Sequence, residues 1–360
     1  MKVSDIPKAI LEQTRRGTAI PALPLALDEN RKFDEKYEKA LARYYIDAGA
    51  GGLAVGVHST QFEIRDPDVK LFEPVLKLAS ETIDTWLKKK SGAQPFLKVA
   101  GICGKTKQAL AEAEFAVKTG YHAGLLSLAA MKDTSIKEMV EHCREVSNAI
   151  PLIGFYLQPS VGGRPLPYEF WRGFFEIENV LAVKMAPFNR YQTFDVVRAL
   201  CESGRENEVT LYTGNDDNIV VDLLSEYRIQ TSRGAKQVRI KGGLLGHWAM
   251  WTHNVVALLR NIHDIVENNK PIPPALLTAG IEITDCNAVF FDFANGFHGC
   301  IPGIHEVLRR QGLLRGTWCL NPKEVLSPGQ SAEIDRVYAA YPHLNDDAFV
   351  KDNLKTWLEE

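Results

Sequence analysis

One lysine of this sequence lies inside an apolar segment, where a charged side chain is unfavourable. Lys184 stands near the end of the run Val180–Ala186, which has the composition of a buried strand. An isolated charge in such a strand costs free energy unless it is paired or neutralised, and burial lowers the pKa of a lysine. A neutral lysine amine is a nucleophile for carbonyl carbons. Lys184 is therefore the first candidate for Schiff-base chemistry.

A tyrosine lies near the end of the preceding apolar run. Tyr156 belongs to the predicted strand Leu152–Gln158, one helix-length segment before Lys184. A phenol hydroxyl on a neighbouring strand could relay the protons that Schiff-base chemistry needs. We predict that both side chains point into one pocket. If Tyr156 transfers these protons, we expect Tyr156→Phe to slow catalysis by on the order of 10²- to 10⁴-fold.

Eight short apolar runs, alternating with amphipathic segments, supply the elements that would position these residues. The predicted strands are Ala19–Ala26, Gly52–Val57, Phe96–Ile102, Ala123–Leu128, Leu152–Gln158, Val180–Ala186, Val209–Thr213 and Val238–Leu245. They are mostly continuous apolar runs, as expected for strands covered on both faces. Eight strand–helix units over about 250 residues predict an α/β fold, a parallel (β/α)8 TIM barrel. A doubly wound open sheet is the alternative, but no G-x-G-x-x-G follows the first strand.

The pattern changes at Pro271. The run Pro271–Pro274 breaks the long helix before it, and the remaining segments have the periodicity of helices. We therefore predict a catalytic barrel over residues 1–270 and a C-terminal helical extension over residues 271–360 that packs on the barrel. The charged tail over residues 346–360 is interpreted as a solvated surface helix.

Polar residues and glycines follow several predicted strands at their carboxyl ends. In a barrel of this type, catalytic residues come from these ends and from the loops after them. His58 and Ser59 follow the second strand and are predicted to bind substrate. Gly243 lies at the end of the eighth strand, where a glycine lets the backbone approach a ligand. The Gly-Asn-Asp segment at 214–216 follows the seventh strand and is expected at the same mouth of the barrel.

These motifs resemble the dihydrodipicolinate synthase / N-acetylneuraminate lyase family of class I aldolases and lyases. The family's Y-N-x-P motif and its later strand ending in K-D or K-E correspond to Tyr156–Pro159 and Lys184–Met185. The stretch Phe297–Gly303 is similar to the family's C-terminal tail. The resemblance implies a (β/α)8 barrel with a C-terminal helical extension, a Schiff base on Lys184 and proton transfer by Tyr156. It also implies a homo-oligomer, a dimer or tetramer.

The sequence departs from the family pattern at three places. His58 and Ser59 take the places of the two hydroxyl residues in the loop that holds the substrate carboxylate. Val161 stands where the synthases carry an arginine, with Arg164 close by, and Leu128–Met131 replaces the aromatic pair that completes their proton relay. A valine cannot make the bidentate contact of an arginine with a carboxylate. We therefore predict a poor dihydrodipicolinate synthase.

The sequence thus predicts a class I lyase that forms a Schiff base with a 2-oxo acid, a sugar acid or a related carbonyl compound. This chemistry requires no metal and no organic cofactor. Two alternatives remain open. One is a sugar-acid dehydratase of the same fold that uses the same Lys184, and the other is a non-catalytic binder of carbonyl ligands on an altered lyase scaffold.

Composition argues against several other classes of protein. The formal net charge of −3 gives no reason to expect nucleic acid or an anionic membrane as a partner. No apolar stretch approaches the roughly 18 residues of a transmembrane helix, and the first residues lack the apolar core of a signal peptide. The expected compartment is the cytoplasm. The six cysteines are scattered and show neither a C-x-x-C pair nor zinc-ligand spacing.

Overall fold

Parallel strands form the centre of the molecule. The computed structural model describes residues 1–90, 92 and 94–359. In this part of the chain the parallel strands are β1 Gly52–Val55, β2 Leu97–Ile102, β3 Ala123–Leu126, β4 Leu152–Tyr156, β5 Val180–Met185, β6 Thr210–Thr213 and β8 Gly234–Gly243. Each pairs in parallel with the next in this order. All carboxyl ends therefore point to one mouth.

The segment predicted as the first strand, Ala19–Ala26, closes the ring between β1 and β8. The Ile20 N–H donates to the Gly243 carbonyl at 3.0 Å, and the Leu23 N–H donates to the Ala54 carbonyl at 2.8 Å. The segment forms isolated parallel bridges and no continuous ladder. Two prolines within it lack the N–H group that a ladder needs. The predicted (β/α)8 barrel is confirmed, and this segment is the eighth element of its wall.

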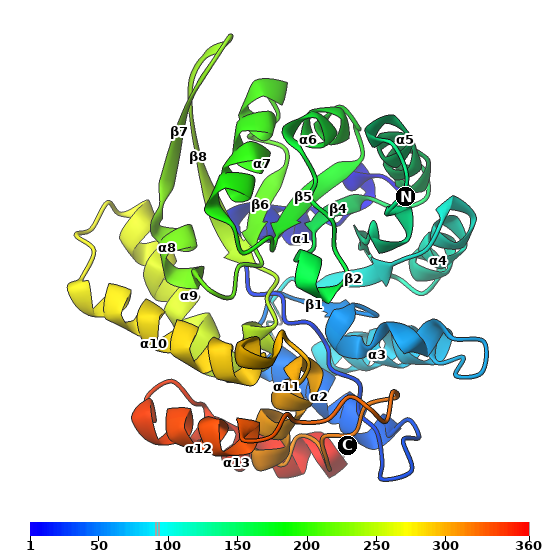
Figure 1. Cartoon of the computed structure of the whole chain (residues 1–360), viewed down its shortest axis with the longest axis vertical. Coiled ribbons are helices and arrows are strands. Elements are labelled where there is room, and N and C mark those ends of the chain that lie inside the picture. The colour runs from blue at the N-terminus through cyan, green and yellow to red at the C-terminus, as the bar shows by residue number, and fades with distance from the viewer. Residues whose placement is uncertain (91, 93, 360) are drawn as a thin grey trace.

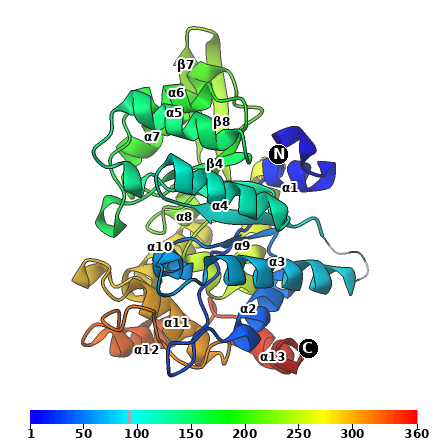
Figure 2. The same cartoon turned by 90° about the vertical axis from the view of Figure 1, so that its right-hand side faces the viewer.

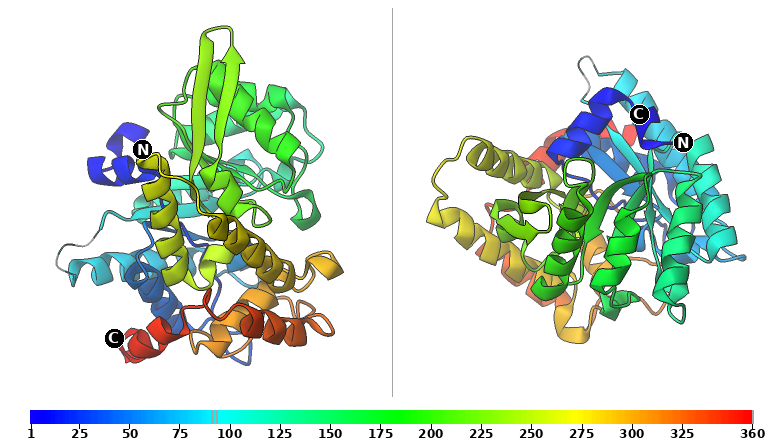
Figure 3. Two further views of the ribbon diagram at one scale, coloured as in Figure 1. Left: turned by 90° about the vertical axis from the view of Figure 1, so that its left-hand side faces the viewer. Right: turned by 90° about the horizontal axis from the view of Figure 1, so that it is seen from above.

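Helices surround the strands (Figures 1 and 3). They are α1 Lys8–Arg16, α2 Glu35–Asp47, α3 Phe72–Lys88, α4 Thr106–Lys118, α5 Ile136–Ser147, α6 Tyr168–Phe175, α7 Arg190–Ser203, α8 Ile219–Leu224 and α9 Thr252–Glu267. One apolar cluster fills the barrel interior, and a larger one fills the layer between strands and helices. Within the described residues, no helix combines the length and apolar character needed to span a bilayer.

A hairpin that the sequence analysis did not predict projects from the barrel (Figures 1 and 3). Strand β7, Glu226–Thr231, pairs antiparallel with the first half of β8. The tight turn between them is followed by Gly234, the first residue of β8, whose φ of +96° is a backbone conformation that favours glycine. Only the second half of β8 therefore belongs to the barrel wall, where it pairs with β6.

The C-terminal helices lie together at one end of the molecule (Figures 1 and 2). They are α10 Pro274–Phe290, α11 Cys300–Arg310, α12 Gln330–Ala340 and α13 Asp347–Glu359. The tail is a helix at the surface, as interpreted, but it is solvated on one face only, because α13 packs against α2. Trp357 is fully buried, and its indole N–H donates to Asp47 at 2.9 Å. The division of the chain at residue 270 stays a prediction.

Candidate active site

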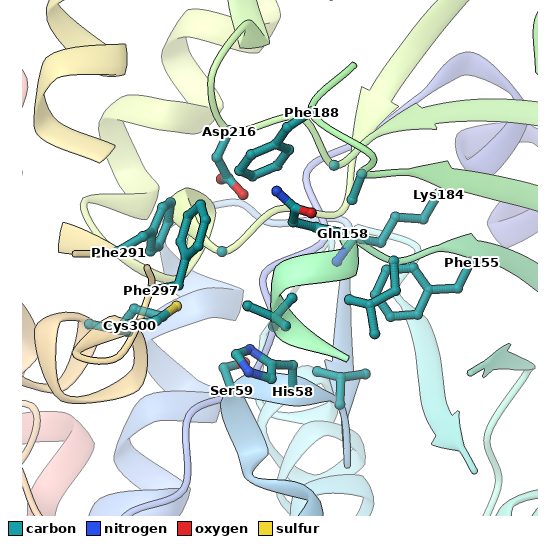
Figure 4. Close-up of a pocket in the computed structure, with 18 residues that line it drawn as sticks. His58, Ser59, Phe155, Gln158, Lys184, Phe188, Asp216, Phe291, Phe297 and Cys300 are labelled. Carbon is teal, nitrogen blue, oxygen red and sulfur yellow. The ribbon is translucent and has the colours of Figure 1, made fainter. Parts of the chain in front are cut away.

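A small cavity of about 90 Å³ lies at the mouth of the barrel (Figure 4). Its walls are mainly apolar and include several aromatic rings. The side chains that bring polar or sulfur atoms to it are His58, Ser59, Gln158, Lys184, Asp216 and Cys300. These residues come from the ends of different strands and from the C-terminal helices. The cavity is large enough for roughly six water molecules, and hence for a small organic acid.

Lys184 extends from β5 into this cavity, where its amine has no close anionic partner. Its Nζ atom lies 4.6 Å from the centre of the Phe155 ring. It forms no ion pair within 4.0 Å in the described part of the chain. Burial lowers the pKa of Lys184 to about 8, and the charge of Asp216 opposes this shift. A larger fraction of this amine is therefore neutral at pH 7 than in an ordinary lysine.

Lys98 on β2 shows how a structural lysine is held in the same barrel. Its side chain is buried, with 5% of the residue exposed. Its Nζ atom donates to Asp84 at 2.8 Å and to Ser80 at 3.0 Å. The ammonium charge is thereby compensated, as buried charges usually are. Lys184 differs because its side chain is only partly buried and its amine has no such partners, which is the arrangement of a reactive amine.

Asp216 places a carboxyl group on the same cavity, just after β6. Its Oδ1 atom accepts a hydrogen bond from the His247 N–H at 3.0 Å. Burial raises the pKa of Asp216 to about 7, although this hydrogen bond and the Lys184 charge act in the opposite direction. A carboxyl group with a pKa near 7 can both donate and accept a proton at neutral pH. The sequence placed segment 214–216 at the mouth, but it did not identify Asp216 as an acid–base group.

Tyr156 does not reach the cavity. The register of β4 and β5 pairs Phe155 with Lys184, and successive residues of a strand point to opposite faces. Phe155 therefore faces the cavity, and Tyr156 faces the layer of helices. The Tyr156 hydroxyl accepts a hydrogen bond from the Leu166 N–H at 3.0 Å, and its ring packs on Trp171 at 5.5 Å. The prediction that Tyr156 and Lys184 share a pocket is wrong, and proton transfer by Tyr156 loses its geometric basis.

The position of Tyr156 changes the expected effect of its substitution. We expect Tyr156→Phe to alter turnover by less than about threefold, because the hydroxyl is remote from the amine. The variant should lose about 1–2 kcal/mol of unfolding free energy, since the buried Leu166 N–H loses its acceptor. Denaturant unfolding and steady-state kinetics measure the two effects. A hundredfold loss of turnover in a normally folded variant would contradict this placement.

His58 and Ser59 lie on the cavity, as predicted, in a short 3-10 helix, His58–Thr60, that follows β1. The Thr60 hydroxyl fixes this turn by donating to the Leu23 carbonyl at 2.7 Å. Ser59 is only 4% exposed, and its Oγ has no hydrogen-bond partner among the described residues. Such an orphaned hydroxyl is available to a ligand. Burial lowers the pKa of His58 to about 4, so its ring is neutral at pH 7. Substrate contact by both residues stays a prediction.

Gly243 does not line the cavity, because its backbone closes the barrel. Its N–H donates to the Thr18 carbonyl at 3.2 Å, and its carbonyl accepts from Ile20. The glycine that approaches the amine is Gly214, where an added Cβ would lie 2.8 Å from Lys184 Cε. The prediction of a substrate-binding Gly243 is therefore wrong in position. Its physical reason, close approach at a strand end, applies to Gly214.

Arg164 does not replace the arginine that is missing at Val161. Val161 lines the cavity, whereas Arg164 holds a neighbouring loop. The Arg164 guanidinium donates to the carbonyls of Met131, Lys132 and Thr134 at 2.8, 2.8 and 3.1 Å. The described lining of the cavity contains no guanidinium. A carboxylate bound there would depend on hydroxyl and backbone donors and on Lys184.

Groups suited to metal binding are not assembled in the described residues. No three His, Cys, Asp or Glu side chains are arranged there to hold a metal ion. Among the groups that line the cavity, Lys184, Asp216 and His58 can take part in proton transfer or carbonyl chemistry. The site can therefore combine a neutral amine with a nearby carboxyl group inside apolar walls.

Comparison with known proteins identifies the fold. No family model and no curated protein matches the sequence. Solved structures do match over most of the chain. Dihydrodipicolinate synthase from Acinetobacter baumannii in complex with pyruvate has a TM-score of 0.71 at 15% identity, covering 90% of this chain and 98% of that one. N-acetylneuraminate lyase from Fusobacterium nucleatum has a TM-score of 0.67 at 15% identity, covering 91% and 99%.

A third similar structure is a prophage protein of the dihydrodipicolinic acid synthase family from E. coli K12 in complex with pyruvate. It has a TM-score of 0.70 at 14% identity and covers 91% of this chain and 98% of that one. The chain therefore has the fold of dihydrodipicolinate synthases and N-acetylneuraminate lyases. The resemblance inferred from the sequence motifs is confirmed at the level of this fold.

Proposed function

We propose that this protein is a lyase of the dihydrodipicolinate synthase / N-acetylneuraminate lyase family that forms a Schiff base with a 2-oxo acid or related carbonyl compound. The observation that carries the proposal is the amine of Lys184, which lines the cavity without an ion-pair partner and has its pKa lowered to about 8. The fold supports the proposal, since two of the similar structures were solved with pyruvate.

The proposed reaction begins at the neutral amine of Lys184. Its lone pair attacks the ketone carbon and forms a C–N bond, while the carbonyl electrons move to oxygen, which takes up a proton. Loss of water from this carbinolamine gives the imine, which is protonated on nitrogen. The protonated imine withdraws electrons and lowers the barrier to breaking an adjacent bond. If a C–C bond of the substrate is cleaved, the protein is an aldolase. If the carbon chain of the substrate loses water, the protein is a dehydratase.

Asp216 takes the acid–base role in this proposal. It lines the same cavity as Lys184, and its carboxyl group has a pKa of about 7. In its protonated form it supplies the proton for the departing carbinolamine oxygen, and as a carboxylate it accepts the proton of a substrate hydroxyl. Ser59 offers its unpaired hydroxyl to the substrate carboxylate, beside the neutral ring of His58.

Imine formation should depend on pH through Lys184. Above its pKa the amine is neutral and nucleophilic, so the rate of imine formation with pyruvate should rise with pH and level off above about pH 8. Initial rates of cyanoborohydride trapping between pH 6 and pH 10 measure this profile. A midpoint near pH 10 would show that the amine is not perturbed by its environment.

The direct test of the function is reductive trapping. The protein is incubated with pyruvate and borohydride, digested and analysed by peptide mass mapping. We expect one reduced adduct, on the peptide that contains Lys184. A panel of hydroxylated 2-oxo acids then separates the outcomes, because pyruvate release indicates an aldolase and an intact oxo-acid chain indicates a dehydratase. Absence of any adduct across the panel would overturn the proposal.

A non-catalytic carbonyl binder is the second candidate. It is favoured by the phenyl ring of Phe155, which lies beside Lys184 and cannot transfer protons. The Tyr156 hydroxyl on the next position is already bonded to the Leu166 backbone. If Asp216 does not supply the missing acid–base function, imines form on Lys184 but do not turn over. Trapping without product formation across the panel would support this candidate.

A further inference from the structure

A second, larger cavity adjoins the one that contains Lys184. Its volume is about 390 Å³. The two cavities share five lining residues, which are Gln158, Phe188, Asp216, Phe291 and Phe297. Phe293 lines only the outer one. We call this outer cavity the aromatic vestibule, after its four phenylalanines Phe188, Phe291, Phe293 and Phe297. The outer cavity therefore adjoins the space that contains the Lys184 amine.

The rings of the vestibule form an ordered group. The Phe297 ring lies edge-on to Phe188, with ring centres 6.1 Å apart, and edge-on to Phe293, with ring centres 5.7 Å apart. Phe188, Phe291 and Phe297 gather on the side of the pocket opposite the Lys184 amine (Figure 4). Phe293 is 65% exposed. An exposed aromatic ring beside an apolar cavity is a typical feature of a binding site.

Two of these phenylalanines have an unusual backbone conformation. Phe188 and Phe297 have φ values of +51° and +69°, a region that bulky residues rarely adopt. The Phe188 N–H is held by the Asn215 side chain at 3.1 Å, and the Phe297 N–H by the Asp292 carbonyl at 2.9 Å. Such conformations persist only where surrounding contacts fix them, and they cluster at functional sites. The rings are therefore fixed in place by the fold.

Two polar side chains of the vestibule, those of Thr284 and Asn287, are already bonded to the protein. The Thr284 hydroxyl donates to the Asp217 carbonyl at 3.1 Å. The Asn287 amide donates to the Asp216 carbonyl at 2.8 Å, and its oxygen lies 2.7 Å from His247 Nδ1. The hydroxyl groups of a sugar chain would have only Gln158, Asp216 and Asp217 as further polar partners here, against four aromatic rings, and each hydroxyl left unpaired costs free energy. The titratable groups of the lining are the carboxyl groups of Asp216 and Asp217, which disfavour an anionic tail.

We propose that the aromatic vestibule binds an aryl group at the far end of the substrate. This inference rests on the proposed function and names its substrate class, which is 2-oxo acids carrying an aromatic ring beyond the reacting bond. For a 4-aryl-4-hydroxy-2-oxobutanoate, the C3–C4 bond breaks and its electrons form the enamine on Lys184. The hydroxyl proton passes to the Asp216 carboxylate, and an aromatic aldehyde leaves through the vestibule. Protonation and hydrolysis of the enamine then release pyruvate.

The test compares ligands that differ only in the group that would enter the vestibule. The probes are 2-oxo-4-phenylbutanoate, 2-oxobutanoate and 2-keto-3-deoxygluconate, each trapped with cyanoborohydride at a series of concentrations. We expect the phenyl compound to reach half-maximal trapping at a concentration at least about tenfold lower than the other two. A fourth probe, 4-phenylbutanoate, has no ketone, and its binding by calorimetry reports on the vestibule without imine chemistry.

Removal of one ring supplies the matched variant. Phe293→Ala should raise the half-saturating concentration of the phenyl compound, relative to that of 2-oxobutanoate, by about three- to tenfold. It should weaken 4-phenylbutanoate binding by a similar factor. Because Phe293 is largely exposed, its loss should not unfold the protein. Tyr191→Ala is the control, since Tyr191 is 87% exposed and lines neither cavity. The control should leave the ratio unchanged.

The outcomes separate this inference from the function on which it rests. Trapping of 2-oxobutanoate without a phenyl preference would overturn the aryl assignment and leave the lyase proposal intact. Binding of 4-phenylbutanoate that depends on Phe293, with no imine from any ketone, would overturn the lyase proposal and retain the aromatic site. If no ketone forms an imine and 4-phenylbutanoate does not bind, both the lyase proposal and the aryl assignment are overturned.

Discussion

Lys184→Met is expected to abolish imine trapping and to lower turnover by at least about 10³-fold, because the amine forms the covalent bond. Methionine has a similar length and no charge, so the fold should be retained. Burial disfavours the charged form of this lysine, which lowers its pKa in the folded state and costs stability at pH 7. The variant should therefore unfold at the same or a higher denaturant concentration than the parent. Peptide mass mapping and denaturant unfolding give the two readouts.

Lys98→Met is the matched control for this experiment. Lys98 is also a lysine on a barrel strand, but its amine is bonded to Asp84 and Ser80. Its loss should lower the unfolding free energy by about 1 kcal/mol, because Asp84 is partly exposed and is resolvated. Trapping on Lys184 should persist. An adduct that forms as readily in Lys184→Met as in the parent would exclude this lysine as the nucleophile.

Asp216→Asn is expected to lower turnover by on the order of 10²- to 10⁴-fold, as for removal of a general acid–base group. The substitution is nearly isosteric, and the asparagine oxygen can still accept the His247 N–H. It should also move the pH profile. The Asp216 charge raises the pKa of Lys184, so its removal should shift the midpoint of imine trapping to lower pH. Trapping rates over a pH series and product formation at one pH measure both effects.

Asp195→Asn provides the control for loss of a carboxylate outside the site. Asp195 lies on α7, pairs with Arg198 at 3.4 Å and lines neither cavity. We expect a change of less than about threefold in turnover, as for most exposed ion pairs, and no shift in the trapping midpoint. Full turnover in Asp216→Asn, with an unmoved midpoint, would show that another group transfers the protons.

The barrel was predictable because its signals are local. Continuous apolar runs separated by amphipathic segments recur along the chain, and each run is found in the wall of the barrel. Lys184 was a candidate for a related reason, since a charged residue in an apolar strand conflicts with its surroundings. Lys98 in the predicted strand Phe96–Ile102 meets the same condition, and only the structure shows that it is paired with Asp84. The hairpin β7–β8 and the buried face of α13 were missed. The first interrupts the expected repeat, and the second depends on contacts between residues far apart in the sequence, such as Trp357 and Asp47.

The residue that faces Lys184 was decided by the tertiary structure alone. Phe155 and Tyr156 are adjacent, both are aromatic, and both suit a buried strand. Pairing between β4 and β5 is irregular between Leu152 and Ile153, and the register beyond this point sets Phe155 opposite Lys184. Because side chains alternate between faces, a difference of one residue exchanges the cavity for the helix layer.

The roles of Asp216 and Gly243 likewise could not be predicted from the sequence alone. Both lie near strand ends, which the order of the elements determines. Their roles depend on partners far along the chain, since Asp216 contacts the backbone of His247 and Gly243 bonds to Thr18 and Ile20. The sequence therefore determined the barrel, its mouth and the candidate lysine. Closure of the ring and strand register decided which neighbours reach that lysine, because these are long-range contacts that no local pattern encodes.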